Sequence, residues 1–204
     1  MTFHEFEDGI KDTLAKYIRD KAQNERYVEL ILGLYEEGAE VTSIIRRSIP
    51  GNFHETQIDL THLEEELGDI IWYISQIRMQ LHLDNKFNDK EISLEEYQKN
   101  VIAKNKEDKH IPKSQMEKGR YFSMGLIKEI GEISTLFGDS LINGVQLNQE
   151  RAEKKLDDSV LYLASIADNY GLDLEQIAMK SLQKAKSRYN KNGIAQIPKI
   201  EEGR

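Results

Sequence analysis

The chain has 204 residues, of which 39% are hydrophobic and 31% charged, so it can bury a core as one domain or as two small halves. It has no cysteine, which excludes disulfides, thiolate zinc sites and cysteine nucleophiles. The net charge of −8 argues against a nucleic-acid binder, because binding to the phosphate backbone needs a basic surface. No charged leader precedes an apolar run and no segment approaches the ~20 apolar residues that cross a bilayer, so we expect a cytoplasmic protein that does not enter a membrane.

Helical periodicity of the apolar residues predicts the secondary structure. Helices are expected at about residues 3–21, 24–47, 59–81, 93–109, 114–141, 148–169 and 173–190. Asn24 is the expected cap of the second helix, and Ser93 with Glu96 three residues later has the form of a capping box. Because no alternating strand pattern of useful length occurs, the predicted fold class is all-α, with amphipathic helices packed against one another.

The second half of the chain repeats features of the first. Aligned positions carry the same residue type, namely Glu37 and Glu129, Glu40 and Glu132, Asp69 and Asp158, and Tyr73 and Tyr162. The last helices of the two halves also match, ISLEEYQKNVIAKNK against LDLEQIAMKSLQKAK. We therefore expect a helical bundle made by a degenerate tandem duplication, with halves at residues 1–111 and 112–204 packed together as one globular unit.

Two pairs of carboxylates are the main candidates for chemistry. Glu37 and Glu40 are three residues apart on one predicted helix, and Glu66 and Asp69 are three apart on the next, so each pair projects from one helix face. Carboxylates gathered in this way repel one another unless cations lie between them, and Mg²⁺ or Mn²⁺ suits an all-oxygen set. The spacing predicts a magnesium site between two antiparallel helices, with Mn²⁺ as a substitute.

Solvated glutamates on helix surfaces are the plain alternative for any single pair. Against this alternative, glycines recur within the motifs, at Gly38, Gly68 and Gly131, where a close approach of backbones would explain a cost of ~1 kcal/mol each. A di-iron site fits poorly, because no Glu-x-x-His occurs at either pair. His62 stands one turn before Glu66 and is expected to have a surface or capping role.

The ordered motifs EExxE, residues 36–40, and ExxD, residues 66–69, resemble those of the MazG-type, all-α nucleoside triphosphate pyrophosphohydrolases, a superfamily that includes the dimeric dUTPases. The resemblance implies a hydrolase acting on acid anhydrides, which cleaves a (d)NTP to a (d)NMP and pyrophosphate. It implies that both halves are MazG-like four-helix units, the first with a complete metal motif. By motif position, the metal ligands would be Glu37, Glu40, Glu66 and Asp69, and the ions would neutralise the polyphosphate and activate a water.

The same resemblance implies residues for the substrate. Tyr73 and its neighbour Trp72 would stack on the base, although core packing is the alternative for Trp72. Lys104 and Asn105 lie in the segment where the family carries basic and amide residues that meet phosphates, and Arg47 is a further candidate unless it is merely an exposed helix end. Glu36 points about 100° away from Glu37 on a helix, so it would either orient the water or face solvent.

The second half departs from the motif, since Lys155 stands where Glu66 would be. We therefore expect one working metal site per chain, with the second half as scaffold that contributes Lys155 or Lys184 to substrate phosphates. A homodimer is expected from the resemblance, although a duplicated chain can also form the paired core within itself. Two other functions stay open, a non-catalytic nucleotide- or metal-binding regulator and a structural helical bundle.

Overall fold

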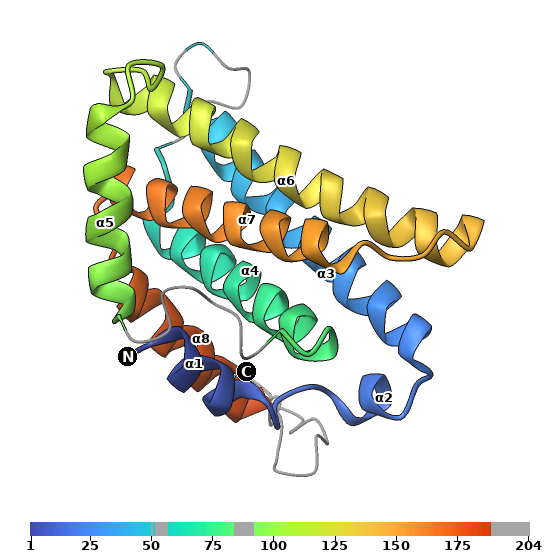
Figure 1. Cartoon of the computed structure of the whole chain (residues 1–204). Helices are drawn as coiled ribbons and strands as arrows, with labels where there is room; N and C mark the ends of the chain where they lie inside the picture. The colour runs from blue at the N-terminus through green and yellow to red at the C-terminus, as the bar shows by residue number, and fades with distance from the viewer. Residues whose placement is uncertain (50, 52–56, 84–91, 189–204) are drawn as a thin grey trace, which may run out of the picture.

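Helices make up most of the part of the chain that the computed structural model describes, residues 1–49, 51, 57–83 and 92–188 (Figure 1). The helices are α1 (Phe3–Ile10), α2 (Lys16–Arg19), α3 (Gln23–Arg47), α4 (Leu60–Gln80), α5 (Leu94–Glu107), α6 (Gln115–Asn143), α7 (Gln149–Asn169) and α8 (Leu174–Arg188). Among these residues the only β-type pairing is an isolated bridge between Thr2 and Ser93. The predicted all-α class is confirmed.

The helix ends agree closely with the expected ones where a polar side chain caps the helix. Ser93 accepts a hydrogen bond of 3.1 Å from the backbone N–H of Glu96, and Asp59 accepts one of 3.0 Å from His62. Asn24 is not the cap of α3, which begins at Gln23 without a side-chain cap. The expected first helix divides into α1 and α2, and the expected end of the last one at residue 190 lies outside the described residues.

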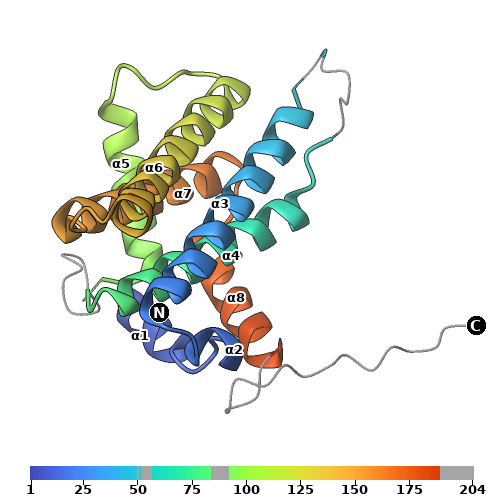
Figure 2. The same cartoon turned by 90° about the vertical axis from the view of Figure 1, so that its right-hand side faces the viewer.

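Two antiparallel helix pairs make up the centre of the fold. α3 with α4 forms one pair, α6 with α7 forms the other, and the pairs meet where α3 packs along α6 (Figure 1). The last helix of each half packs on the opposite half, α8 on α4 and α5 on α7. Figure 2 shows α8 below α4 from the side.

One set of buried apolar residues runs through both halves. It includes Leu34 and Ile70 from the first half and Leu126 and Leu163 from the second, all of them 0% exposed. The described residues of the two halves therefore share a core, while the boundary at residue 111 stays a prediction. None of the described helices is long and apolar enough to cross a membrane. The cytoplasmic location likewise stays a prediction.

A glycine and a tyrosine meet in the same way in both helix pairs. A Cβ atom placed on Gly33 would lie 2.3 Å from the Tyr73 ring, and one on Gly125 would lie 2.2 Å from the Tyr162 ring. Gly33 and Gly125 each stand four residues before the aligned glutamates, and the two tyrosines are also aligned. This repeated contact supports the expected duplication, which itself stays a prediction.

Close helix approaches explain two of the three motif glycines. A Cβ on Gly38 would lie 2.7 Å from Ile130 of α6, and one on Gly68 would lie 3.2 Å from Ser181 of α8. At Gly131, by contrast, no described atom lies within 4 Å of that position. The approaches at Gly38 and Gly68 bring second-half helices directly beside the two carboxylate motifs.

Candidate active site

Three acidic side chains from two helices converge between α3 and α4. Glu37 of α3 and Glu66 and Asp69 of α4 each offer a carboxylate oxygen, and these oxygens lie within 4.8 Å of one another. The helices are antiparallel neighbours and the motif residues lie about one turn apart, so both motifs face the same space. The Glu66 side chain is only 10% exposed, which makes this a partly buried cluster rather than a solvated helix face.

The electrostatics of this cluster fit a cation. Burial raises the pKa of Glu37 to about 9, with further contributions from a hydrogen bond with Glu66 and from the negative charges of Asp69, Glu66 and Glu40. The cluster therefore contains more carboxylates than it can keep ionised on its own near neutral pH. A hard divalent ion bound by oxygen would relieve this repulsion, and the donor set suits Mg²⁺ or Mn²⁺.

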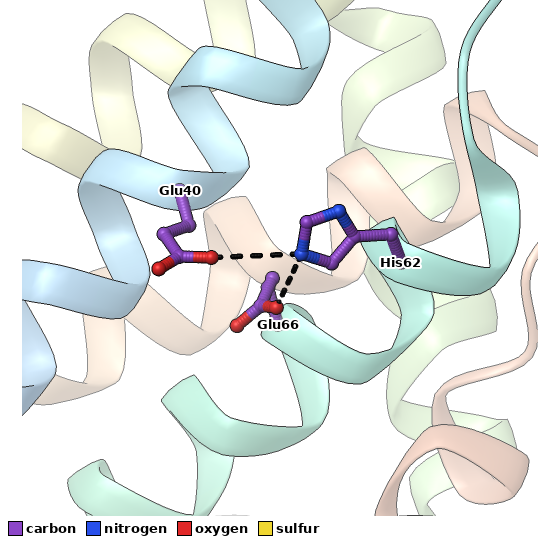
Figure 3. A group of neighbouring side chains, drawn as sticks. All are labelled: Glu40, His62 and Glu66. Atoms are coloured by element: carbon purple, nitrogen blue, oxygen red, sulfur yellow. Dashed lines mark ion pairs between the residues drawn. The ribbon is translucent and has the colours of Figure 1, made fainter. Parts of the chain in front are cut away.

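Glu40 belongs to a second group beside the first. The imidazole Nε2 of His62 lies 2.7 Å from Oε1 of Glu66 and 3.5 Å from Oε2 of Glu40. Figure 3 shows the ring between these two carboxylates. The backbone N–H of His62 donates to the Asp59 side chain that caps α4, whereas the His62 side chain, expected at the surface or in a cap, contacts the carboxylates. The spacing of four residues between His62 and Glu66 on one helix is the sequence signal for this contact.

A pocket next to the carboxylates receives its positive charge from the second half of the chain. It is lined by Glu37, Asp69, Trp72, Tyr73, Ser181, Lys184, Ala185 and Arg188. The ammonium group of Lys184 donates a 2.5 Å hydrogen bond to Oδ2 of Asp69. Lys184 is one of the two second-half lysines expected to meet phosphates, whereas Arg188 was not expected. It is four residues after Lys184 on α8, so both side chains project from one face.

Trp72 and Tyr73 both line this pocket and also have packing roles. The indole N–H of Trp72 donates a 2.9 Å hydrogen bond to Oγ1 of Thr13, and the two rings meet edge to face with centroids 4.9 Å apart. Tyr73 in addition lies over Gly33. The pocket thus has an aromatic wall formed by these two rings, in addition to the cationic side chains of α8.

Other expected substrate residues lie away from this pocket. Asn105 donates a hydrogen bond of 2.9 Å to the hydroxyl of Ser165 and lines a different pocket, with Lys106 and Asp168. Lys104 is exposed on α5, and that helix packs on α7 rather than on α4. The cationic side chains beside the carboxylates come from α8, and the role of Lys104 and Asn105 in phosphate binding stays a prediction.

Arg47 and Glu36 are both exposed on α3. Arg47 is in the last turn of the helix, where its positive charge interacts favourably with the helix dipole. Neither residue lines the pocket next to the carboxylates. Their suggested roles in substrate binding and water orientation stay predictions.

The second-half position that aligns with Glu66 is Lys155, and its ammonium group lies between two carboxylates. Nζ of Lys155 lies 2.7 Å from Glu129 and 3.0 Å from Glu132. Lys128 contacts the same two glutamates, at 2.5 and 3.2 Å. Hydrogen bonds from Lys155 and Lys128 lower the pKa of Glu132 to about 2. Two lysines thus compensate the glutamates of the second half, whereas in the first half Lys184 pairs with Asp69 and the pKa of Glu37 stays raised.

Comparison with known proteins supports the reading of the first half. Residues 25–111 match the family model for the MazG nucleotide pyrophosphohydrolase domain. This match spans most of α3 and all of α4 and α5, so the MazG resemblance is confirmed for this part of the chain. Searches of curated proteins and of solved structures gave no match.

Proposed function

We propose that the protein is a divalent-metal-dependent nucleoside triphosphate pyrophosphohydrolase, which cleaves a (d)NTP to a (d)NMP and pyrophosphate. The MazG match supports the reaction class. The observation that carries the proposal is the pocket in which the Glu37 and Asp69 carboxylates face Lys184 and Arg188. A triphosphate with its metal ions requires such a combination, because it presents negative oxygens to the cations of the protein and metal charge to the carboxylates.

The residues of the chain divide this task between its two halves. Glu37, Glu66 and Asp69 hold the metal, with Glu40 at the edge of the cluster. When bound, Mg²⁺ or Mn²⁺ neutralises charge on the triphosphate and favours attack by water. Lys184, now paired with Asp69, exchanges this partner for a phosphate oxygen.

Positioning of the nucleotide falls to the remaining lining residues. Arg188 is the second phosphate ligand, at the exposed end of α8. Tyr73 and Trp72 provide flat faces for the base, and the hydrogen bond from Trp72 to Thr13 holds that ring in place. The polyphosphate thereby lies between α4 and α8, with the base toward the aromatic wall.

Adjacent glutamates on α4 allow a direct test of the metal site. Pyrophosphate release is measured with each common NTP and dNTP, including dUTP because the resemblance extends to dUTPases, with Mg²⁺ and with EDTA. Replacement of the buried carboxylate, Glu66→Gln, is expected to abolish release, whereas Glu65→Gln at the exposed neighbour is expected to retain it. Nucleotide binding without turnover by the unaltered protein would overturn the proposal and favour the non-catalytic regulator, and full activity of Glu66→Gln would overturn the ligand assignment.

We also propose that the protein is a homodimer through the outer face of α3 and α6. Large apolar side chains are exposed there, with Leu32 64%, Tyr35 50% and Ile142 83% accessible, and they border an apolar groove. Covering such a face by a second copy would remove apolar surface from water. Light scattering should give twice the chain mass, and Leu32→Lys should give the monomer; a monomeric unaltered protein would contradict the proposal.

A further inference from the structure

A histidine faces the carboxylate site from α4. His62 lies four residues before Glu66, and its Nε2 atom contacts Glu66 of the same helix and Glu40 of α3 (Figure 3). The two helices that carry these side chains are long and pack directly against each other. A nitrogen and two carboxylate oxygens are thus held together by the central helix pair of the fold, not by a loop.

The positions of the three side chains allow an ion to enter and be held. The side chains of His62 and Glu40 are 44% and 46% exposed, whereas that of Glu66 is 10% exposed. An ion would therefore arrive from solvent between His62 and Glu40 and meet Glu66 at the bottom. Ligands bound at about 2.0–2.2 Å from an ion lie about 3.0–3.4 Å from one another, and the present separations of 2.7 and 3.5 Å lie close to this range on either side.

Glu66 is shared with the all-oxygen cluster. It belongs both to the group with Glu37 and Asp69 and to the group with His62 and Glu40. A carboxylate has two oxygens and several lone pairs, so one Glu66 side chain can serve two neighbouring ions. The geometry therefore provides two adjacent cation positions of different composition, an inner one with oxygen ligands only and an outer one with an imidazole.

We propose that His62, Glu40 and Glu66 form an outer metal position that selects a borderline transition-metal ion, such as Co²⁺ or Zn²⁺, over Mg²⁺. Mg²⁺ prefers oxygen ligands and retains its waters, whereas imidazole nitrogen suits transition metals. The identity of the ion at the outer position thus depends on a single residue. This inference rests on the proposed function, since it concerns the metal at the same site.

Binding measurements on the full chain test the outer position without reference to activity. The protein is stripped with EDTA, desalted and titrated with Co²⁺, with the visible spectrum and the bound stoichiometry recorded, in the presence of excess Mg²⁺ to fill the inner position. One Co²⁺ per chain should still bind, and His62→Gln should weaken its binding about tenfold or more. His110→Gln, at an exposed histidine in the segment after α5, is the matched control and should leave the titration unchanged.

A spectroscopic measurement on the unaltered protein detects the imidazole ligand directly. Pulsed EPR of bound Co²⁺, again with excess Mg²⁺ at the inner position, should detect coupling to an imidazole nitrogen, and the coupling should disappear in His62→Gln. If no nitrogen coupling appears, or Mg²⁺ displaces all of the Co²⁺, then His62 only pairs with its carboxylates and the inference is wrong.

The two proposals fail in different ways. Pyrophosphate release with Mg²⁺ but no nitrogen coupling would overturn the outer metal position and leave the proposed function standing. Nitrogen coupling without turnover of any nucleotide would support the metal position and overturn the enzymatic proposal.

Discussion

Replacing Lys155 by methionine should destabilise the protein far more than the same change at Lys154. Lys155 is 13% exposed and bonds to Glu129, which is 5% exposed, at 2.7 Å. Breaking a buried ion pair by removing one partner costs ~3–5 kcal/mol, because the other charge is left uncompensated. Lys128 remains within 2.5 Å of Glu129 and can replace part of the lost compensation, so we expect about 2–3 kcal/mol. Lys154 is 70% exposed, and its pair with Asp158 should contribute about 1 kcal/mol or less.

Urea and thermal unfolding of the two single variants give the comparison. In a chain of this size, 2–3 kcal/mol corresponds to a fall in Tm of about 4–12 °C, and the Lys154→Met variant should fall by about 4 °C at most. A double variant, Lys155→Met with Glu129→Gln, should recover most of the loss, because no buried charge is then left unpaired. Equal losses at the two lysines, or no recovery in the double variant, would refute the view that Lys155 takes the place of a cation in the second half.

Three further predictions concern packing, pH and metal. Gly33→Ala should destabilise the protein by about 1–3 kcal/mol and raise the KM for nucleotide, because the new Cβ would lie 2.3 Å from the Tyr73 ring. Gly131→Ala has no described atom within 4 Å of its Cβ and should stabilise the protein by up to about 1 kcal/mol; urea unfolding measures both changes in stability, and steady-state kinetics measures the KM. Burial raises the pKa of Asp157 from 3.8 to about 6, and the positive charge of Arg78 offsets this only in part. Between these two pH values Asp157 is protonated in the folded state and ionised in the unfolded state, so the free energy of unfolding should fall as pH rises from about 4 to about 6. Asp157→Asn should remove this contribution, and unfolding curves of both proteins at several pH values would show a constant difference if the prediction is wrong. Mg²⁺ at saturating concentration should raise the Tm and EDTA should reverse the rise, since an ion bound only by the folded state stabilises it; an unchanged Tm would count against the metal site.

The helices and the carboxylate motifs could be predicted because both depend on local spacing. A residue three or four positions away on a helix shares a face whatever the rest of the chain does, so the convergence of Glu37, Glu66 and Asp69 needed only two neighbouring helices. The same rule places His62 beside Glu66, four residues later, but it does not distinguish a contact between the side chains from the expected surface or capping role.

The origin of the cationic side of the pocket could not be predicted from local spacing. Lys104 and Lys184 stand on helices with matching sequence patterns, and the chain order favoured the one that follows α4 directly. The choice between them is made by packing of distant segments, at Gly68, where the absence of a side chain admits Ser181 and with it α8. Periodicity shows which face of a helix is apolar, but it does not show which other helix covers that face.

Phosphorus NMR of a reaction with the preferred nucleotide and Mg²⁺ is the most direct measurement of the proposed activity, because it identifies the bond that is broken. A pyrophosphate resonance that grows together with that of the monophosphate, and only with metal present, is the predicted result. Release of orthophosphate with a nucleoside diphosphate would place the cleavage at another bond and contradict a pyrophosphohydrolase.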